Sequence, residues 1–123
     1  MKKKIQITLL GMCLMFVVTG CIHLTSSTTL MNYGDYKKIT KDNIKQIEIV
    51  RYTEAGDNRK IVDKESIPEV YDNLNKKKIG NKTDMSCLDN TTVYIFTLDT
   101  GEKISIEIEC EWVVINNIRY ILE

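Results

Sequence analysis

The chain has 123 residues, with 17 basic side chains, 17 acidic side chains and one histidine. A chain of this length supports one small hydrophobic core, so a multidomain enzyme is excluded. The balanced charge also excludes the strongly basic surface that nucleic-acid binding requires.

The first twenty residues have the pattern of a secretory signal peptide. Three lysines follow Met1, and no charged residue occurs from Ile5 to Gly20. A basic start followed by an apolar run is typical of export signals. As a helix this run would rise about 24 Å, which is less than the roughly 30 Å hydrocarbon core of a bilayer. We therefore expect residues 1–20 to be cleaved off and not to persist as a transmembrane helix.

The apolar run ends in Val18, Thr19, Gly20 and Cys21. This ending resembles the lipobox of bacterial lipoproteins, in which an aliphatic residue and two small residues precede a cysteine. In that family the cysteine sulfur is alkylated with diacylglycerol, and a signal peptidase cuts just before it. The resemblance implies that Val18, Thr19 and Gly20 are recognised by the peptidase and that Cys21 becomes the lipidated first residue. The alternative is an ordinary signal peptide with a cysteine close to its cleavage site.

Lipidation at Cys21 would hold the protein on the extracytoplasmic face of the cell membrane. Each buried methylene contributes about 0.8 kcal/mol, so one acyl chain binds reversibly whereas the two chains of a diacylglycerol hold durably. Cleavage also removes Lys2, Lys3 and Lys4, which leaves 14 basic residues against 17 acidic ones, a formal charge of −3. We therefore expect membrane lipid, bound through S-diacylglycerol-Cys21, as a partner and no nucleic acid.

Two cysteines remain for the folded part of the chain. The lipobox resemblance implies that Cys13 is lost with the signal peptide and that Cys21 carries the lipid, which leaves the thiols of Cys87 and Cys110. In an exported protein they predict one disulfide, with two unpaired cysteines as the alternative. No metal site is expected, because the single histidine, His23, lies beside the anchor and no CxxC pair occurs.

The segment that follows the anchor has no sustained hydrophobic period and contains a Ser/Thr cluster. We predict a lipidated flexible tether over residues 21–42, whose lysines touch anionic lipid or are simply solvated, and a folded domain over residues 43–123. The domain begins with the strand-like sequence IKQIEIVRY, followed by the turn EAGDN and a short strand RKIV. These two strands predict a hairpin.

Residues 62–78 predict one amphipathic helix. Its apolar stripe, at helical spacing, consists of Ile67, Val70, Tyr71 and Leu74. Ser66 and Glu69 fit a capping box at its start, and Pro68 lies in the first turn, where a missing N–H costs nothing.

The last third of the chain has the strongest β pattern. The strand TTVYIFTL is followed by the turn DTGE and by KISIEIECEW, whose apolar residues alternate with polar ones through Cys110 and Trp112. Asn116 and Asn117 tolerate a positive φ and predict a two-residue hairpin. The expected fold is a single small α+β domain, ββα followed by an antiparallel β-meander, with the helix packed on the sheet.

The whole layout resembles small lipoproteins of Gram-positive bacteria. It combines the lipobox, a polar tether and a compact domain whose end carries Thr100-Gly101, Asn116-Asn117 and Tyr120-Ile121-Leu122. The domains of those lipoproteins carry no assigned activity, so the resemblance implies a fold more than a function.

Groups that could perform chemistry are sparse. Glu107, Glu109 and Glu111 are predicted to project from one face of a strand about 7 Å apart, which indicates a solvated acidic face, with a hydrolase as the alternative. The serines lack a histidine partner in the domain, and the glycines form no phosphate loop. We therefore expect no enzymatic activity, no cofactor and no metal.

One strand is apolar on both faces. Tyr94 and Phe96 share one face, and Val93 and Ile95 share the other. Tyr94 and Phe96 are candidates for a partner-binding patch, with burial in the core as the alternative. The sequence thus predicts a non-enzymatic, membrane-anchored binding or accessory lipoprotein, or else an immunity or inhibitor lipoprotein that captures a peptide toxin or a protease at a sheet edge.

Overall fold

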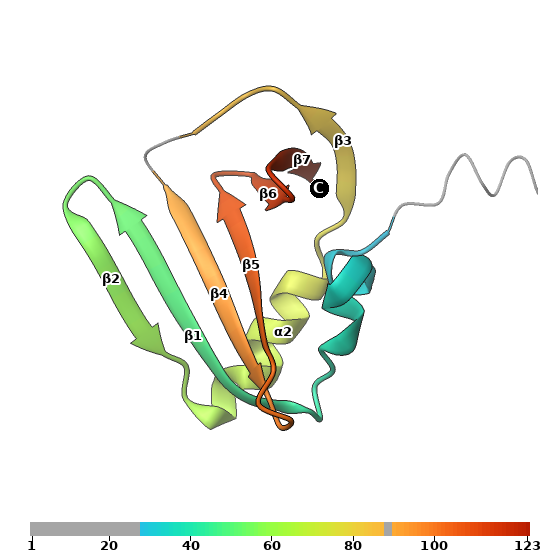
Figure 1. The fold of residues 1–123 in the computed structure, drawn as a ribbon, viewed down its shortest axis with the longest axis vertical. Coiled ribbons are helices and arrows are strands. Elements are labelled where there is room, and N and C mark those ends of the chain that lie inside the picture. The colour runs from blue at the N-terminus through green and yellow to red at the C-terminus, as the bar shows by residue number, and fades with distance from the viewer. Residues whose placement is uncertain (1–27, 88–89) are drawn as a thin grey trace, which may run out of the picture.

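A computed structural model of the protein describes residues 28–87 and 90–123. These residues form a single small domain that consists of a seven-stranded antiparallel sheet and one α-helix (Figure 1). The domain is mostly β, so it fits the expected α+β class loosely. In this part of the chain no helix is long and apolar enough to cross a membrane. The predicted signal peptide, the lipobox with Cys21, and His23 lie outside the described residues.

The elements follow in chain order within the described residues. They are the 3-10 helices η1 (Leu30–Asn32) and η2 (Gly34–Lys38), the strands β1 (Ile44–Thr53) and β2 (Gly56–Ile61), the 3-10 turn η3 (Lys64–Ser66), the helix α2 (Ile67–Asn75), and the strands β3 (Ile79–Thr83), β4 (Thr91–Leu98), β5 (Lys103–Glu109), β6 (Trp112–Ile115) and β7 (Ile118–Leu122). Across the sheet the strand order is β2-β1-β4-β5-β6-β7-β3. Strand β3 was not predicted, and it pairs with the last strand, β7.

The predicted hairpin of β1 and β2 is confirmed, but its turn is shorter than the predicted EAGDN. Thr53 pairs with Gly56, so Gly56, Asp57 and Asn58 belong to β2. Asn116 and Asn117 have φ of 52° and 64° and join β6 to β7, as a two-residue turn with positive φ at both positions requires. Gly101 has φ of 91° in the turn between β4 and β5, a conformation that is open to glycine at little cost.

The core lies between one face of the sheet and the helices. Figure 1 shows the sheet curling so that α2, η1 and η2 lie on the same side of it. The side chains that fill this space include Leu30, Ile47, Leu74, Phe96, Ile106 and Val113, each at most 2% exposed. The apolar stripe of α2 therefore meets the sheet, as its spacing predicts.

The predicted flexible tether is wrong over residues 28–42. Leu30 is 0% exposed, and Met31 and Ile39 are each 1% exposed, so the segment forms part of the core. Its backbone is also held, because the N–H of Leu30 donates to the carbonyl of Lys77 at 2.8 Å. The apolar residues of this segment are spaced irregularly, as 3-10 turns allow, and irregular spacing leaves no helix or strand period to detect.

The long strand predicted through Trp112 is also wrong. Strand β5 ends at Glu109, and Cys110 adopts φ of 50° in a two-residue turn with Glu111. Glu109 then pairs with Trp112, so the chain reverses where alternation had predicted a continuous strand. Cys110 is exposed and does not face the core.

The start of the helix differs from the predicted capping box. Ser66 has helical backbone angles and makes no side-chain capping hydrogen bond. The turn η3 precedes the helix instead, and the N–H of Ser66 donates to the carbonyl of Asp63 at 2.8 Å. Pro68 lies in the first turn, as predicted.

Candidate functional site

Strand β5 has a neighbour on both sides along only half of its length. Strand β4 pairs with β5 from Lys103 to Glu109, whereas β6 pairs only with Glu107, Ile108 and Glu109. The first half of β5 therefore presents an edge to the place that a longer β6 would occupy. We call this place the β5 notch, and it is bounded by residues 103–106 of β5.

The hydrogen-bond pattern determines which backbone groups face the β5 notch. The N–H of Leu98 donates to the carbonyl of Glu102 at 2.8 Å, which makes these two a hydrogen-bonded pair. In an antiparallel ladder such pairs alternate, so Ile104 bonds to β4, whereas Lys103 and Ser105 direct their N–H and C=O groups away from β4. Both residues are exposed, and no turn or loop hydrogen bond found among the described residues uses these four backbone groups.

A cleft of about 490 Å³ lies along the β5 notch. Its walls come from η2 and the residue before it, from the first half of β5, and from the end of β6. The residues that line it are Tyr33, Gly34, Asp35, Tyr36, Glu102, Lys103, Ile104, Ser105, Val114, Ile115 and Asn116. The lining combines an open strand edge, two tyrosines and charges of both signs, which suits an extended polypeptide better than a compact apolar ligand.

The two tyrosines of the cleft are held in place by the sheet. The ring of Tyr33 packs against that of Tyr120, with centroids 6.2 Å apart and a 50° tilt. A hydrogen bond with Tyr120 raises the pKa of Tyr33. Burial raises the pKa of Tyr36, and the negative charge of Glu107 raises it further. Both phenols are therefore neutral at physiological pH.

Sequence reasoning missed this site. Tyr33 and Tyr36 fell in the predicted tether, and nothing in the pattern of β6 shows that it is too short to cover β5. The alternation in KISIEIECEW identified β5 itself, but it did not show which edge of the strand is open.

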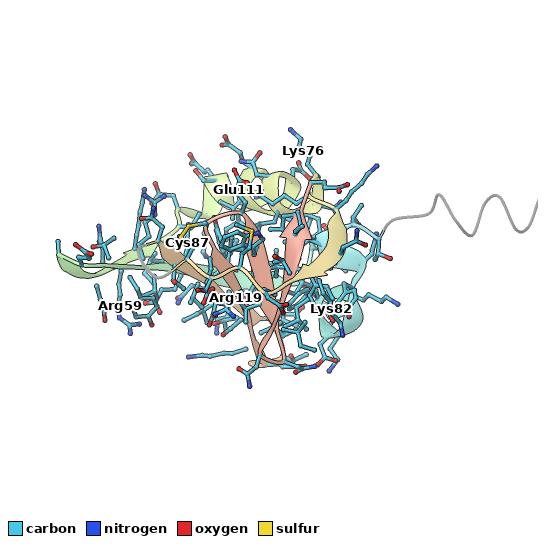
Figure 2. The ribbon with its side chains drawn as sticks, turned by 90° about the horizontal axis from the view of Figure 1, so that it is seen from above. Arg59, Lys76, Lys82, Cys87, Glu111 and Arg119 are labelled. Atoms are coloured by element: carbon cyan, nitrogen blue, oxygen red, sulfur yellow. A yellow bond between two sulfur atoms is a disulfide. The ribbon has the colours of Figure 1, made fainter. Side chains whose placement is uncertain are left out.

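The predicted glutamate row does not form. Arg119 binds Glu109 with Nε at 2.6 Å from Oε2 and with a second contact of 3.4 Å to Oε1. Glu109 is only 9% exposed, and Glu111 lies beyond the end of the strand. Figure 2 shows Glu111 well apart from Arg119. Within residues 28–87 and 90–123 no group of three His, Cys, Asp or Glu side chains is placed to hold a metal ion.

The predicted partner patch is wrong as well. Phe96 is 0% exposed and belongs to the core, and Tyr94 is partly buried against the same core. Their face of β4 is the one that α2 and η1 cover. Val93 and Ile95, on the opposite face, are partly buried.

The predicted disulfide between Cys87 and Cys110 is confirmed. The Cα atoms of the two residues are 6.1 Å apart. The bond ties the segment after β3 to the turn between β5 and β6. It therefore fixes the far end of β5, opposite the β5 notch.

Comparison with protein families, with curated proteins and with solved structures finds no match for this chain.

Proposed function

We propose that this protein is a non-enzymatic lipoprotein, anchored through Cys21 on the extracytoplasmic face of the membrane, that binds an extended peptide segment in the β5 notch. The anchoring part is supported by the basic start, the apolar run and the lipobox residues Val18, Thr19, Gly20 and Cys21. The binding part is supported by one observation, the unpaired edge of Lys103 and Ser105 inside a cleft.

A peptide would bind by adding a strand to the sheet. It would take the place of a longer β6 and exchange hydrogen bonds with the N–H and C=O groups of Lys103 and Ser105. Tyr36 and Asp35 on the opposite wall would contact its side chains. Backbone pairing would supply affinity, and the side-chain contacts would supply selectivity.

A peptide toxin or a segment of a protease fits this mode of binding, because either can present an extended strand. If the ligand is a toxin or a protease that harms the cell, the protein would act as an immunity or inhibitor lipoprotein. A hydrolase that uses the glutamate row is not proposed, because Glu109 is engaged by Arg119 and Glu111 lies outside the strand.

The anchor is tested by mass spectrometry of the native protein. We expect the mature chain to begin at Cys21 with a diacylglycerol thioether, and we expect Cys21→Ala to shift the protein from the membrane fraction to the soluble fraction. A bare sulfur at Cys21, or a C21A variant that stays in the membrane fraction, would contradict anchoring.

The β5 notch is tested by Ser105→Pro. Proline lacks the N–H that faces the notch, and the β4–β5 ladder does not use that N–H, so this strand-edge position tolerates proline. The matched control is Arg59→Pro, which removes an outward N–H from the open edge of β2 in the same way.

Both variants and the unmodified lipoprotein are used as bait for crosslinking and capture on intact cells. We expect a stoichiometric peptide or protein partner that is retained by R59P and lost by S105P. Equal recovery by both variants would exclude the β5 notch, and the absence of any stoichiometric partner from the unmodified bait would exclude the binding function.

A further inference from the structure

We propose that Lys76, Lys77 and Lys78 contact anionic lipid headgroups and thereby orient the domain on the membrane. We call these three residues the lysine cluster. The inference rests on the proposed anchoring through Cys21, and it adds which face of the domain meets the bilayer.

The proposed anchor is close to the folded domain. Seven residue steps separate Cys21 from Thr28, where the described domain begins. Even at full extension they would span about 25 Å. A domain of this size is about 30 Å across, so the anchor cannot hold it a full diameter from the bilayer. The end of the domain opposite Thr28 therefore cannot reach the headgroups, and the surface around Thr28 stays within about 25 Å of them.

The lysine cluster lies at this same surface. The N–H of Ile79 donates to the carbonyl of Thr28 at 2.9 Å, and Lys78 pairs with Thr29 in an isolated β-bridge. Lys76, Lys77 and Lys78 are all exposed. Figure 1 shows the chain entering the domain beside the end of α2 and the start of β3, which the cluster connects.

The charges of the lysine cluster are free to act on an external surface. The ion pairs found within the described residues engage Lys38 with Glu102 at 3.3 Å and Lys41 with Asp72 at 2.6 Å, but they include no member of the cluster. The lysines that were predicted to touch lipid are thus partly neutralised, whereas the cluster is not.

The neighbours of the lysine cluster add to its positive charge. Residues 75–83 contain Lys82 as a fourth, exposed lysine and no acidic residue. Two acidic residues adjoin the lysine cluster through the backbone. The carbonyl of Glu123 accepts from the N–H of Lys78 at 3.0 Å, and the carbonyl of Asp72 accepts from the N–H of Lys76 at 3.1 Å, but the Asp72 carboxylate is paired with Lys41. With Lys82 and Lys41 counted beside the cluster, the local charge remains positive with these two acidic residues included.

The lysine cluster can orient the domain because it lies at one end of the domain, in a chain whose net charge is negative. The mature chain carries a formal charge of −3, so its charge as a whole does not attract it to an anionic bilayer. Figure 1 shows the β1–β2 hairpin across the domain from η1 and η2, and Figure 2 shows Arg59 and Lys82 toward opposite ends of the domain. Each lysine near an anionic surface favours contact roughly fivefold, so three to four lysines at one end select that end.

Lysine acetylation of the full lipidated protein tests this orientation. The protein is reconstituted in vesicles of phosphatidylcholine and in vesicles that also contain phosphatidylglycerol, and the acetylation rate of each lysine is read by mass spectrometry. We expect the lysine cluster to react about fivefold more slowly on the anionic vesicles. Lys60, on the hairpin, should react at the same rate on both, and high salt should abolish the difference.

A variant pair adds an independent reading. In Lys76→Gln/Lys77→Gln/Lys78→Gln, Lys82 should lose its protection on anionic vesicles, because the orienting charge has been removed. The matched control, Lys60→Gln, should retain that protection.

Three outcomes would overturn the inference. Equal acetylation of the lysine cluster on both vesicles, in protein that still floats with them, would exclude headgroup contact while leaving the anchor intact. Equal protection by inorganic phosphate without vesicles would identify an anion site and not a membrane contact. Protein that fails to float with either vesicle would refute the anchoring itself and the inference with it.

Discussion

The contact between Glu109 and Arg119 is the most buried ion pair found among the described residues. Their side chains are 11% and 29% exposed, whereas those of Glu48 and Arg59 are 25% and 57% exposed. The hydrogen bond to Glu109 raises the pKa of the Arg119 guanidinium, so that group stays charged. This pair has replaced the solvated acidic row that alternation predicted.

Arg119→Ala should lower the urea midpoint of unfolding far more than Arg59→Ala. Removing Arg119 leaves a buried carboxylate without its partner, which is costly, whereas an exposed pair contributes at most about 1 kcal/mol. Adding Glu109→Gln to Arg119→Ala should recover part of the loss, because the orphaned charge disappears. Equal midpoints for the two single variants would show that Glu109 is satisfied by water.

Tyr36 should make the protein sensitive to alkali. Burial, followed by the charge of Glu107, raises its pKa above the ordinary value of about 10. As the pH rises, the unfolded chain loses the phenol proton first, so the free energy of unfolding is undiminished below pH 10 and falls as the pH approaches the pKa of the folded state. Urea unfolding at pH 8 to 11 should show a shallower decline for Tyr36→Phe. Tyr52→Phe, on an exposed position of β1, should leave the profile unchanged.

At the scale of the element, η1 and η2 make the N-terminal segment part of the core. Leu30 is 0% exposed and its N–H binds the backbone of Lys77. This contact joins the start of the domain to the end of α2. The same contact brings the lysine cluster next to the proposed anchor.

Leu30→Ala should destabilise the domain by about 2–5 kcal/mol, the usual cost of truncating a buried leucine. Lys37→Ala, an exposed position in η2, should change the free energy of unfolding by less than about 0.5 kcal/mol. Urea denaturation followed by the fluorescence of the single tryptophan measures both. If L30A were as stable as the parent protein, residues 28–42 would behave as the tether that the sequence predicted.

At the scale of the whole molecule, the sheet ends in β2 on one side and in β3 on the other, and the β5 notch is a further open stretch of strand within it. Residue Thr28 pairs with the start of β3. All six residues of β2 are exposed, but Asp57, Arg59 and Lys60 place charges along it, which discourages pairing with another chain. The β5 notch instead lies in a cleft between tyrosines. The charged edge of β2 thus resembles a protected edge, whereas the β5 notch has the features of a binding edge.

The disulfide joins distant parts of the molecule, because it ties the segment after β3 to the turn between β5 and β6. The bonded residues are 23 apart in the sequence, so the chain-entropy model predicts about 3 kcal/mol of stabilisation. Cys87→Ser/Cys110→Ser should lower the free energy of unfolding by about that amount, and a reductant should destabilise the parent protein but not the variant. If the reductant left the parent unchanged, the bond would contribute nothing to stability.

Local patterns in the sequence determined several parts of this protein. The paired asparagines identified the turn from β6 to β7, the stripe from Ile67 to Leu74 identified α2, and elimination identified the pair Cys87 and Cys110. Each of these depends on the conformational preference of a few neighbouring residues or on the count of one residue type. The export signal and lipobox are of the same kind, and they remain predictions.

Only the tertiary structure decided the burial of residues 28–42, the reversal at Cys110 and the opening of the β5 notch. The burial depends on which distant surface covers an irregular segment. The reversal placed Cys110 at a positive φ although the alternation continued through it. The notch depends on how far β6 extends beside β5. The length of a strand is determined partly by its pairing with a neighbouring strand, so the sequence of β6 alone does not reveal it.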